Sequence, residues 1–519
     1  MVVEFIQRRE GFNPHLNRGN AVEQLRILAD EVVQREDLID NPRTPVLREM
    51  SSRYSMQNEF GCLLFHTKVS ARSPDVTVED VNRVDQSVRE KILNEINEVR
   101  KYLKEKRLIR VDRSIGTSKR FSLKATAVVS ESYPHLALMF QMNYFPTQED
   151  KISDIVTLDI PEWPRKIIYV DPKENINLIL GTDYYGELKM SALRLAMNIA
   201  RESGLGLGVH AGGKVFKFSK DGRTVEKGAL VFGLSGTGKT TITVSDHGIT
   251  PPDTVLVRQD DIMILFRDGY AAGTEMNLYP KTDSINTLPE LKSAAIQRDS
   301  ILENVSVKEG KVDFDDTAFS TNGRAIALRS QVRTVDDKVD IKKIDFMFFL
   351  TRRNDQPVAG RLKSKEQAVA YFMLGESVMT SAGTTNKELV GRAIRVPGFD
   401  PFIIEPRWIS GVRLLEILGV AHDITAYILN TGHVGVNKIP PAVTKAVVLA
   451  IAKGEGRWEY NEDLKYDVLT EAPGLDLKGF DVKTNFGDKY SYMMNDLREE
   501  RRRYLANTFP ELVFLTSYL

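Results

Sequence analysis

The chain has 519 residues, which is too long for one ordinary domain, so we expect two large domains or one elaborate α/β body. Lys plus Arg and Asp plus Glu both number 71, and this balance excludes a global attraction to nucleic acid or to a membrane surface. Cys62 is the only cysteine, which excludes an internal disulfide and a cysteine-cluster metal site. No signal-peptide pattern and no membrane-spanning apolar run is present, so we expect a soluble cytoplasmic protein.

The first 222 residues are predicted to form a mixed α/β domain. Val, Ile and Leu recur at helical spacing among charges over 88–107, which predicts an amphipathic surface helix. Alternating and β-branched residues predict sheet over 121–144. Short apolar strands are predicted at 167–170 and 177–180, and a helix over 191–203 that ends at a glycine series.

We place the domain boundary between residues 222 and 223, because 219–223 is polar and rich in turn formers. Beyond it, apolar strands alternate with helical patterns, which favours a mixed α/β domain with a partly parallel sheet over 223–519. The predicted strands are 229–232, 255–257, 262–266, 344–350 and 426–429. A charged helix is predicted over 490–508, and its run Arg501-Arg502-Arg503 is interpreted as a solvated helix face rather than a nucleic-acid site.

A phosphate-binding loop of the form G-x-x-x-x-G-K-[ST] follows the predicted strand 229–232. Its residues are Gly233, Leu234, Ser235, Gly236, Thr237, Gly238, Lys239 and Thr240. In such a loop, backbone N–H groups surround phosphate oxygens, the lysine reaches the outer phosphates and the threonine hydroxyl binds Mg²⁺. A helix opening at Thr241 would add a favourable dipole for the anion. The sequence therefore predicts that this protein uses a nucleoside triphosphate.

Candidate polar residues also occur outside this loop. Asp260 and Asp261 follow a predicted strand, where phosphate-loop enzymes place the carboxylate that holds or orients Mg²⁺. His210 lies in a Gly-rich segment, and a lone histidine is more often structural. Arg72 and Arg324 are loop arginines, and a guanidinium is the natural clamp for carboxylate or phosphate. These residues predict an ATP- or GTP-using enzyme and leave the phosphoryl acceptor open.

Taken in order, these segments resemble ATP-dependent phosphoenolpyruvate carboxykinase. Residues 233–241 read GLSGTGKTT, which matches the loop of that family letter for letter. Further resemblances lie at 71–74 (family G-R-S-P), 181–189 (G-T-x-Y-x-G-E-M-K), 279–282 (Y-A-K-T), 298–305 (R-D-A-L-L-E-N-V) and 322–324 (N-T-R). The resemblance implies a two-domain fold, with a substrate-side domain over 1–222 and a P-loop nucleotide-binding domain over 223–519.

The resemblance also implies a reaction, in which oxaloacetate loses CO₂ and its enolate takes the γ-phosphoryl group of ATP. Arg72 would clamp the substrate carboxylate, Tyr184 would contact the substrate, and Arg324 would bridge substrate and γ-phosphate. The implied catalytic set is Arg72, Tyr184, Lys189, Lys239, Asp260, Asp261 and Arg324. The implied nucleotide-binding set is the loop from Gly233 to Thr241 with Lys281, Glu303 and Lys438, the last in place of an arginine of the family.

The metal site departs from the family pattern. The resemblance implies that Thr240 binds Mg²⁺, and that His210 and Asp261 ligate a second metal, usually Mn²⁺, which stabilises the enolate as a Lewis acid. The family lysine that ligates this Mn²⁺ corresponds to Met190, which follows Lys189, and a thioether is a poor ligand for Mn²⁺.

Two main hypotheses follow from this departure. One is a divergent carboxykinase, and the other is an ATP-dependent kinase of a small hydroxyl compound that carries out no decarboxylation. A relative of HPr kinase is a weaker alternative, because that match ends at the phosphate loop. A non-catalytic ATP-binding regulator would be expected to lose Lys239 or the carboxylates, and both are kept. The oligomeric state is left open.

Overall fold

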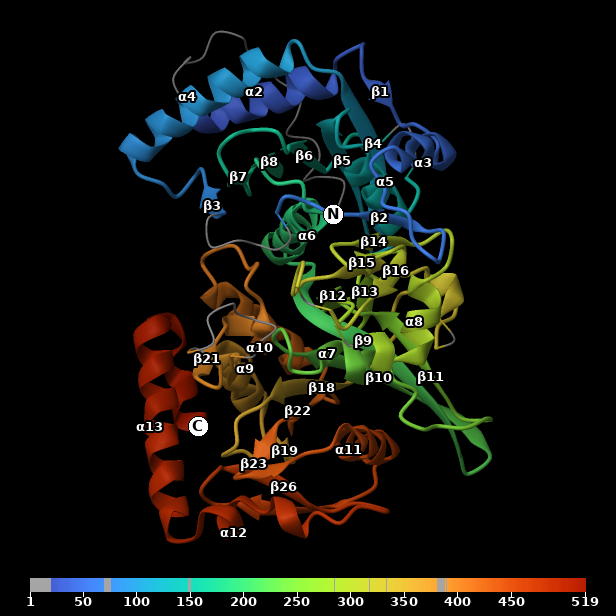
Figure 1. Cartoon of the computed structure of the whole chain (residues 1–519). Helices are drawn as coiled ribbons and strands as arrows, with labels where there is room; N and C mark the ends of the chain where they lie inside the picture. Colours follow the sequence, from blue (N-terminus) through green and yellow to red (C-terminus); the bar gives the residue numbers. More distant parts are fainter. Residues whose placement is uncertain are drawn as a thin grey trace.

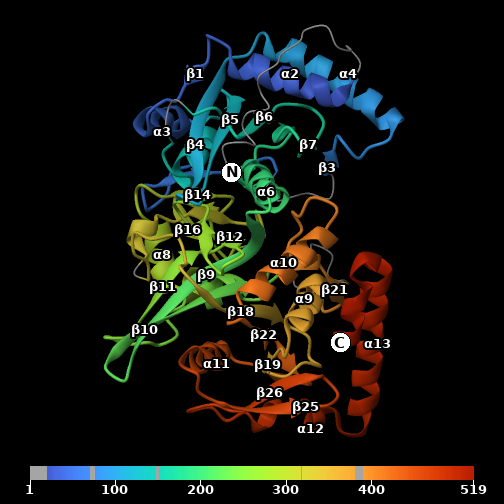
Figure 2. The ribbon, with the colours of Figure 1, turned by 180° about the vertical axis from the view of Figure 1, so that it is seen from behind.

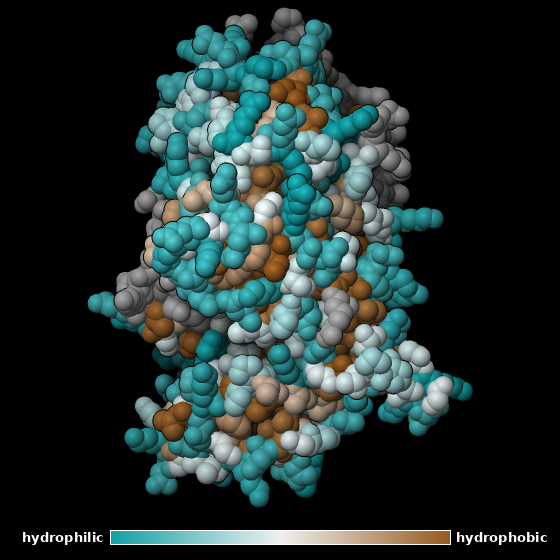
Figure 3. Space-filling view, turned by 45° about the vertical axis from the view of Figure 1, so that its right-hand side comes forward, coloured by the Kyte–Doolittle hydropathy of each residue, from teal (hydrophilic) through white to brown (hydrophobic). Residues whose placement is uncertain are grey.

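The structure is a computed structural model, and it describes residues 20–69, 76–147, 151–283, 285–316, 318–332, 334–379, 388 and 390–519. Arg72, the predicted clamp of the substrate carboxylate, lies outside the described residues. Figure 1 shows an upper part, coloured mainly blue to teal, and a lower part that contains the end of the chain. Figure 3 shows one face of the molecule, on which hydrophilic residues surround smaller groups of hydrophobic ones.

The upper part is built on a seven-stranded mixed sheet in the order β1-β4-β5-β6-β8-β7-β3. The strands are β1 (Ile39–Asp40), β3 (Thr77–Asp80), β4 (Leu108–Ser118), β5 (Phe121–Ser130), β6 (Ile155–Ile160), β7 (Ile167–Asp171) and β8 (Ile176–Leu180). Strands β5, β6 and β8 run parallel, while β4 and β5 form an antiparallel pair.

Helices cover both faces of this sheet (Figure 1). On one face, α2 (Ala21–Val33) and α4 (Gln86–Leu103) pack against alternate strand residues such as Val156 and Leu158. On the other face, α3 (Thr44–Ser52), α5 (Pro134–Asn143) and α6 (Tyr185–Glu202) bury the residues between them, including Ile155. The alternation follows from the pleat, which points successive side chains to opposite faces.

The lower part is built on a ten-stranded sheet in the order β13-β12-β9-β10-β18-β22-β19-β26-β25, with β11 also paired to β9. The strands are β9 (Gly206–Lys220), β10 (Arg223–Phe232), β11 (Thr254–Gln259), β12 (Ile262–Phe266), β13 (Ala271–Gly273), β18 (Ile344–Thr351), β19 (Ala359–Arg361), β22 (Thr425–Asn430), β25 (Arg457–Asn461) and β26 (Tyr466–Glu471). Its parallel centre is β10-β18-β22. Because β10 has parallel and antiparallel neighbours on its two sides, the phosphate loop leaves a strand buried within the sheet.

Smaller elements complete the fold. The helices of the second half are α7 (Lys239–Val244), α8 (Pro289–Ala295), α9 (Lys365–Leu374), α10 (Trp408–Val420), α11 (Pro441–Lys453), α12 (Val482–Phe486) and α13 (Tyr490–Thr508). The short strands are β2 (Leu63–Phe65), β14 (Ile301–Glu303), β15 (Ser306–Lys308), β16 (Lys311–Asp313), β17 (Arg324–Ile326), β20 (Glu376–Val378), β21 (Ala393–Arg395), β23 (His433–Val434) and β24 (Asn437–Lys438). Strand β2 pairs with β14, which ties the first segment of the chain to the second.

The predicted boundary at 222/223 falls in the turn between β9 and β10. These two strands pair antiparallel from Arg223–Lys220 to Phe232–Ala211, so β9 shares its sheet with the second segment. The division into 1–222 and 223–519 stays a prediction, and by sheet membership β9 groups with the nucleotide-binding segment. In the part of the chain that the structure describes, no helix combines the length and apolar character needed to cross a membrane.

Two sequence predictions need correction. The sheet predicted over 121–144 holds only for β5, because 134–143 is helix α5, which begins with Pro134 at its first turn. All ten residues of α5 are buried, including the polar His135, Gln141 and Asn143, so the helix has no solvent-facing side and shows no helical period in its sequence. Helix α6 starts at Tyr185 rather than at 191, since its first turns bury charged residues that an amphipathic pattern would place in solvent.

Candidate active site

The phosphate loop leaves the buried end of β10 and closes at the first turn of α7, as the sequence predicted. Gly236 and Gly238 have φ values of 76° and 90°, which glycine adopts without strain. A Cβ at Gly233 would lie 2.4 Å from the Thr237 hydroxyl oxygen, so a side chain there would obstruct the loop. Because Gly238 is the N-cap of α7, the free N–H groups of that helix face the space where phosphates would bind.

Neighbouring strands brace the loop from behind. The Thr237 hydroxyl donates to Leu234 O at 2.7 Å, and the Thr431 hydroxyl donates to Thr237 O at 2.7 Å. Arg352, directly after β18, donates from Nη1 to Gly236 O at 2.9 Å. These three bonds occupy carbonyl oxygens of the loop and use none of its N–H groups, although the N–H of Thr237 itself donates to Leu234 O at 3.1 Å.

Asp261 is the centre of a cluster formed by two lysines and a histidine. Lys189 Nζ from α6 lies 2.5 Å from its Oδ2, His210 Nε2 from β9 lies 2.9 Å from its Oδ1, and Lys239 Nζ from α7 lies 3.2 Å from the same Oδ1. Burial alone would raise the pKa of Asp261, but these neighbours outweigh it and hold the pKa well below the usual range. The cluster therefore joins the phosphate-loop lysine to groups that the sequence separates widely.

Glu275 is a second carboxylate of this cluster. Its Oε1 lies 3.0 Å from Lys189 Nζ and accepts a hydrogen bond from Asn143 Nδ2 at 2.7 Å. Burial raises the pKa of Glu275 to about 7, although Lys189 opposes the shift. The pKa of Lys189 is itself raised, because Asp261 and Glu275 outweigh the cost of burying its charge. Lys189 is thus held as an ammonium ion in a buried position.

The neighbouring Met190 takes a different place. It is 7% exposed and packs in the hydrophobic cluster on the α5 and α6 side of the upper sheet. Successive helical residues point in directions about 100° apart, and of this pair Lys189 reaches Asp261 while Met190 packs in the hydrophobic cluster. The amino group beside His210 and Asp261 is therefore supplied by Lys189, and the methionine does not remove it.

On the substrate side, Tyr184 and Arg324 meet through Asn322. The Asn322 amide donates to Tyr184 Oη at 2.9 Å, and Arg324 Nε donates to Asn322 Oδ1 at 3.2 Å. Lys281 is paired through its backbone with Arg324, and burial, followed by the nearby guanidinium, lowers the pKa of Lys281 to about 8. The structure thus gathers three predicted site residues, namely Tyr184, Lys281 and Arg324.

Tyr279 lies among these residues and was missed as a site residue. Its ring centroid is 5.3 Å from the Arg324 guanidinium and 5.3 Å from Lys189 Nζ, within the range of cation–π attraction. Its hydroxyl donates to Glu303 Oε2. The tyrosine stood within the quoted motif at 279–282, but only the fold shows that its ring lies beside both cations.

Other predicted residues have less direct positions. Glu303 is fully buried, accepts from Tyr185 N at 2.9 Å, and has a pKa raised to about 7 by burial, so its predicted place in the nucleotide pocket stays a prediction. Lys438 is exposed on the β23–β24 hairpin that follows Thr431. Thr240 and Thr241 lie half-buried in the first turn of α7, where Thr240 could hold a metal ion.

Comparisons with known proteins identify the family. Residues 36–478 match the sequence model of the family described as phosphoenolpyruvate carboxykinase. The chain is 41% identical over 497 residues to the phosphoenolpyruvate carboxykinase (ATP) of Aeropyrum pernix, a match that covers 95% of this chain and 99% of that protein. The chain belongs to the ATP-dependent phosphoenolpyruvate carboxykinase family.

More distant carboxykinases support this assignment. The phosphoenolpyruvate carboxykinase (ATP) of Lysinibacillus sphaericus is 28% identical over 401 residues, covering 71% of this chain and 72% of that protein. The glycosomal phosphoenolpyruvate carboxykinase (ATP) of Trypanosoma cruzi is 26% identical over 419 residues, covering 74% and 83%. The family resemblance and the mixed α/β fold class predicted from the sequence are confirmed, whereas the cytoplasmic location stays a prediction.

The family implies a divalent metal ion, and the residues around Asp261 fit one. His210 Nδ1 lies 3.1 Å from Phe399 O, which orients the ring with Nε2 toward Asp261. Two buried oxygens nearby, Asp260 Oδ1 and Glu275 Oε2, have no hydrogen-bond partner in the described structure and could bind metal-bound water. The described residues form no group of three His, Cys, Asp or Glu side chains able to hold a metal. A metal would therefore use His210 and Asp261 with water or substrate, and this N and O donor set suits Mn²⁺ or Mg²⁺.

Proposed function

We propose that this protein converts oxaloacetate and ATP into phosphoenolpyruvate, ADP and CO₂. The observation that carries this proposal is the convergence of Lys189, His210 and Lys239 on Asp261, beside the phosphate loop, in a chain of the carboxykinase family. Family membership alone would not show whether Met190, in place of the family lysine, prevents the site from binding a metal ion. The position of Lys189 supports a complete site, and the alternative of a kinase without decarboxylation finds no support in the comparisons.

ATP is proposed to bind at the phosphate loop. The N–H groups of 233–238 and the N-terminus of α7 would surround the phosphates, and Thr240 would hold Mg²⁺. Lys239 would leave Asp261 and pair with an outer phosphate, since its hydrogen bond to Asp261 is 3.2 Å long and readily exchanged. Lys438 is proposed to lie on the base side.

Decarboxylation is proposed to occur beside Asp261. A divalent cation held there by His210 and Asp261 would, when bound, supply Lewis-acid stabilisation of the enolate oxygen. The Lys189 ammonium ion would hold an anionic oxygen of the substrate, and Asp260 would orient water. Arg72 is proposed to clamp the substrate carboxylate, and Tyr184 to contact the substrate.

Phosphoryl transfer is proposed to depend on Arg324 and Lys281. Charge on the transferring group is spread over its equatorial oxygens, so fixed cations lower the barrier without chemical change of their own. Arg324 is held by Asn322 and by the Tyr279 ring, which limits its rotation before substrate binds. Lys281 is its backbone bridge partner, so the two cations would act on the transferring group together.

The test is direct. Purified protein with oxaloacetate, ATP, Mg²⁺ and Mn²⁺ should form phosphoenolpyruvate, measured by a coupled assay and by product analysis. Lys239→Ala should lower kcat by at least about 100-fold, while Lys220→Ala, which changes an exposed lysine of the β9–β10 hairpin, should have no effect. No product at high enzyme concentration would overturn the proposal, and ATP consumption with a panel of hydroxylated metabolites would then test the kinase alternative.

A further inference from the structure

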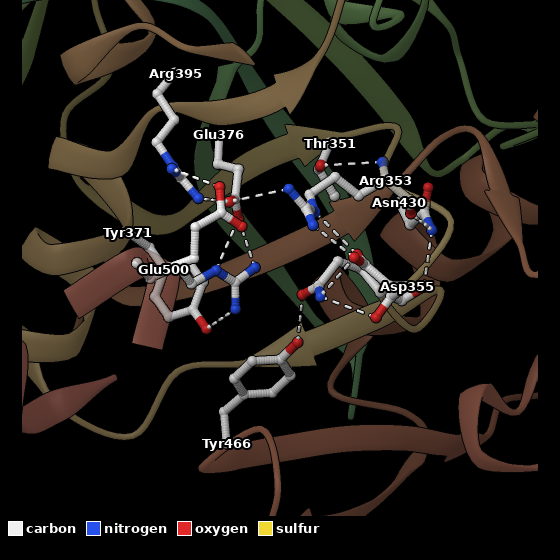
Figure 4. A network of polar contacts seen from close by, with 11 residues as sticks. Thr351, Arg353, Asp355, Tyr371, Glu376, Arg395, Asn430, Tyr466 and Glu500 are labelled. Atoms are coloured by element: carbon white, nitrogen blue, oxygen red, sulfur yellow. Dashed lines mark hydrogen bonds and ion pairs between the residues drawn. The ribbon is translucent and has the colours of Figure 1, made fainter. Parts of the chain in front are cut away.

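A buried ionic cluster joins the C-terminal helix α13 to the lower sheet. We call it the Glu376 cluster, and its members are Glu376, Arg353, Arg395 and Arg501. Arg501 donates from Nε and Nη2 to Glu376 Oε2 at 2.8 and 2.5 Å. Arg395 Nη2 and Arg353 Nη1 donate to Glu376 Oε1 at 2.8 and 3.3 Å, and Figure 4 shows their side chains meeting the carboxylate.

The position of Glu376 in this cluster is tightly determined. It follows Gly375, the C-cap of α9, whose φ is 50°. A Cβ at Gly375 would lie 1.7 Å from Val396 O, so only glycine allows α9 to end and β20 to begin there. The carboxylate therefore emerges from a backbone with little freedom.

Arg353 connects this cluster to the phosphate loop. Its guanidinium also donates to both Asp355 oxygens, at 2.9 and 2.6 Å, as Figure 4 shows. Its carbonyl oxygen accepts from Asn430 Nδ2 at 2.8 Å. On one side of Arg353 in the chain, Arg352 donates to Gly236 O, and after Asn430, Thr431 donates to Thr237 O. Of the two residues that bond to the loop, Arg352 is thus the chain neighbour of Arg353, and Thr431 is the chain neighbour of Asn430, which donates to Arg353 O.

Arg501, on helix α13, is the member of the Glu376 cluster that comes from the last part of the chain. It is 2% exposed, contrary to the solvated face expected for the run 501–503, whereas Arg503 is exposed. Helix α13 runs beside α9 in both views (Figures 1 and 2). It lies beyond residue 478, where the match to the family model ends. A segment outside the family's matched region is therefore connected, through Glu376 and Arg353, to the residues that hydrogen-bond to the phosphate loop.

Removing Arg501 would loosen this connection without leaving a buried charge unpaired. Glu376 would keep Arg353 and Arg395, at 3.3 and 2.8 Å. Burial would raise the pKa of Glu376, but the three guanidiniums lower it to about 2, so the carboxylate stays ionised at neutral pH. The carboxylate would then be free to shift toward Arg395, since the bond to Arg353 is the longest of the set.

We propose that Arg501 is a positioning residue for nucleotide binding. Its hydrogen bonds to Glu376 fix the carboxylate that pairs with Arg353. Arg353 and the turn 351–355 thereby stay in the position in which Arg352 and Thr431 hydrogen-bond to the phosphate loop. This inference rests on the proposed function only in that ATP is the ligand of that loop.

The test compares Arg501→Met, Arg501→Lys and the matched control Arg503→Met on the same helix. We expect Arg501→Met to raise the Kd for ATP and the KM for ATP by about tenfold, as for other residues that act on a site through packed groups. The KM for oxaloacetate should change less than twofold. Arg501→Lys should recover part of the affinity, and Arg503→Met should bind ATP like the unaltered protein.

Hydrogen exchange gives a second readout, which serves even where the methionine variant folds poorly. In Arg501→Lys, amides of 233–238 and 351–356 should exchange faster, while those of 216–226 in the distant hairpin should not. A fall in melting temperature with unchanged ATP affinity and unchanged exchange would overturn the inference. Binding of ATP without formation of phosphoenolpyruvate would overturn the proposed function alone, and no ATP binding by the unaltered protein would overturn both.

Discussion

Asp261 and Glu376 are each a carboxylate surrounded by three nitrogen-bearing side chains, and the comparison shows how similar surroundings serve different purposes. Asp261 faces Lys189, His210 and Lys239, and its side chain is 22% exposed. Glu376 faces Arg353, Arg395 and Arg501, and its side chain is 5% exposed. In both clusters the opposite charges offset the free-energy cost of burying the carboxylate.

The identity of the cations makes the difference. Lysine is a flexible point charge that can exchange one anion for another, and a neutral histidine can bind a metal. Arginine keeps its proton and holds a carboxylate through a planar fork. Asp261 is therefore suited to give up its partners to metal, phosphate and substrate, while Glu376 is suited to hold elements in place. The predictions below test this contrast.

The largest expected effect is on catalysis at Asp261. Asp261→Asn removes the carboxylate charge that Lys189, His210 and Lys239 surround, and with it a proposed metal ligand, so it should lower kcat by about 10³-fold. The melting temperature should fall less than in Glu376→Gln, because the buried Lys189 keeps Glu275 as a counter-charge, and calorimetry can check this. Asp268→Asn, at an exposed ion pair with Arg120, is the control and should keep full activity. Equal activity in both variants would contradict the reactive role of Asp261.

The largest expected effect on stability is at Glu376. Glu376→Gln leaves the buried guanidinium of Arg501 without a counter-charge and removes one carboxylate partner of Arg353 and of Arg395, so it should lower the free energy of unfolding by about 3–5 kcal/mol. Glu500→Gln, which removes a half-exposed partner of Arg395, should cost less than about 1 kcal/mol. Denaturant unfolding measures both. A Glu376→Gln effect as small as that of Glu500→Gln would show that the Glu376 cluster stabilises little.

The same carboxylate should also give a pH dependence. Because the pKa of Glu376 is lowered from 4.5 to about 2 in the folded state, its stabilisation is complete above pH 4.5 and is lost as the pH falls toward 2. The loss amounts to about 3 kcal/mol. The difference in unfolding free energy between the unaltered protein and Glu376→Gln should therefore shrink between pH 5 and pH 3. A constant difference would mean that the residue is not ionised in the folded protein.

The smallest effect is expected at Met190. Since Lys189 supplies the amino group at Asp261 and Met190 packs in the hydrophobic cluster, Met190→Leu should change kcat less than about twofold and stability by less than about 1.5 kcal/mol. Lys189→Leu is the matched comparison on the same helix, and it should abolish carboxykinase activity. If Met190→Leu lost as much activity as Lys189→Leu, Met190 would have to take part in the metal site.

Local patterns in the sequence predicted much of the fold. Helix α13 and strand β12 have the bounds expected for them, because a charged amphipathic helix and a short apolar strand have distinct periods. Helix α5 was predicted as strand, because a helix buried on every side has no polar face to reveal its period. This prediction failed because the period of apolar residues shows which side of an element is buried and does not show the backbone conformation itself.

The sequence by itself determined the phosphate loop, because that motif depends on neighbouring residues whose spacing fixes the local backbone, and its resemblance to a known family indicated ATP as the expected donor. Only the tertiary structure decided that Lys189 rather than Met190 faces Asp261, and that Arg501 rather than Arg503 is buried. Adjacent helical residues point to different surroundings, and which of them meets a distant carboxylate depends on how helix, strand and loop pack together. The contacts concerned join residues far apart in the chain, and no local pattern encodes them.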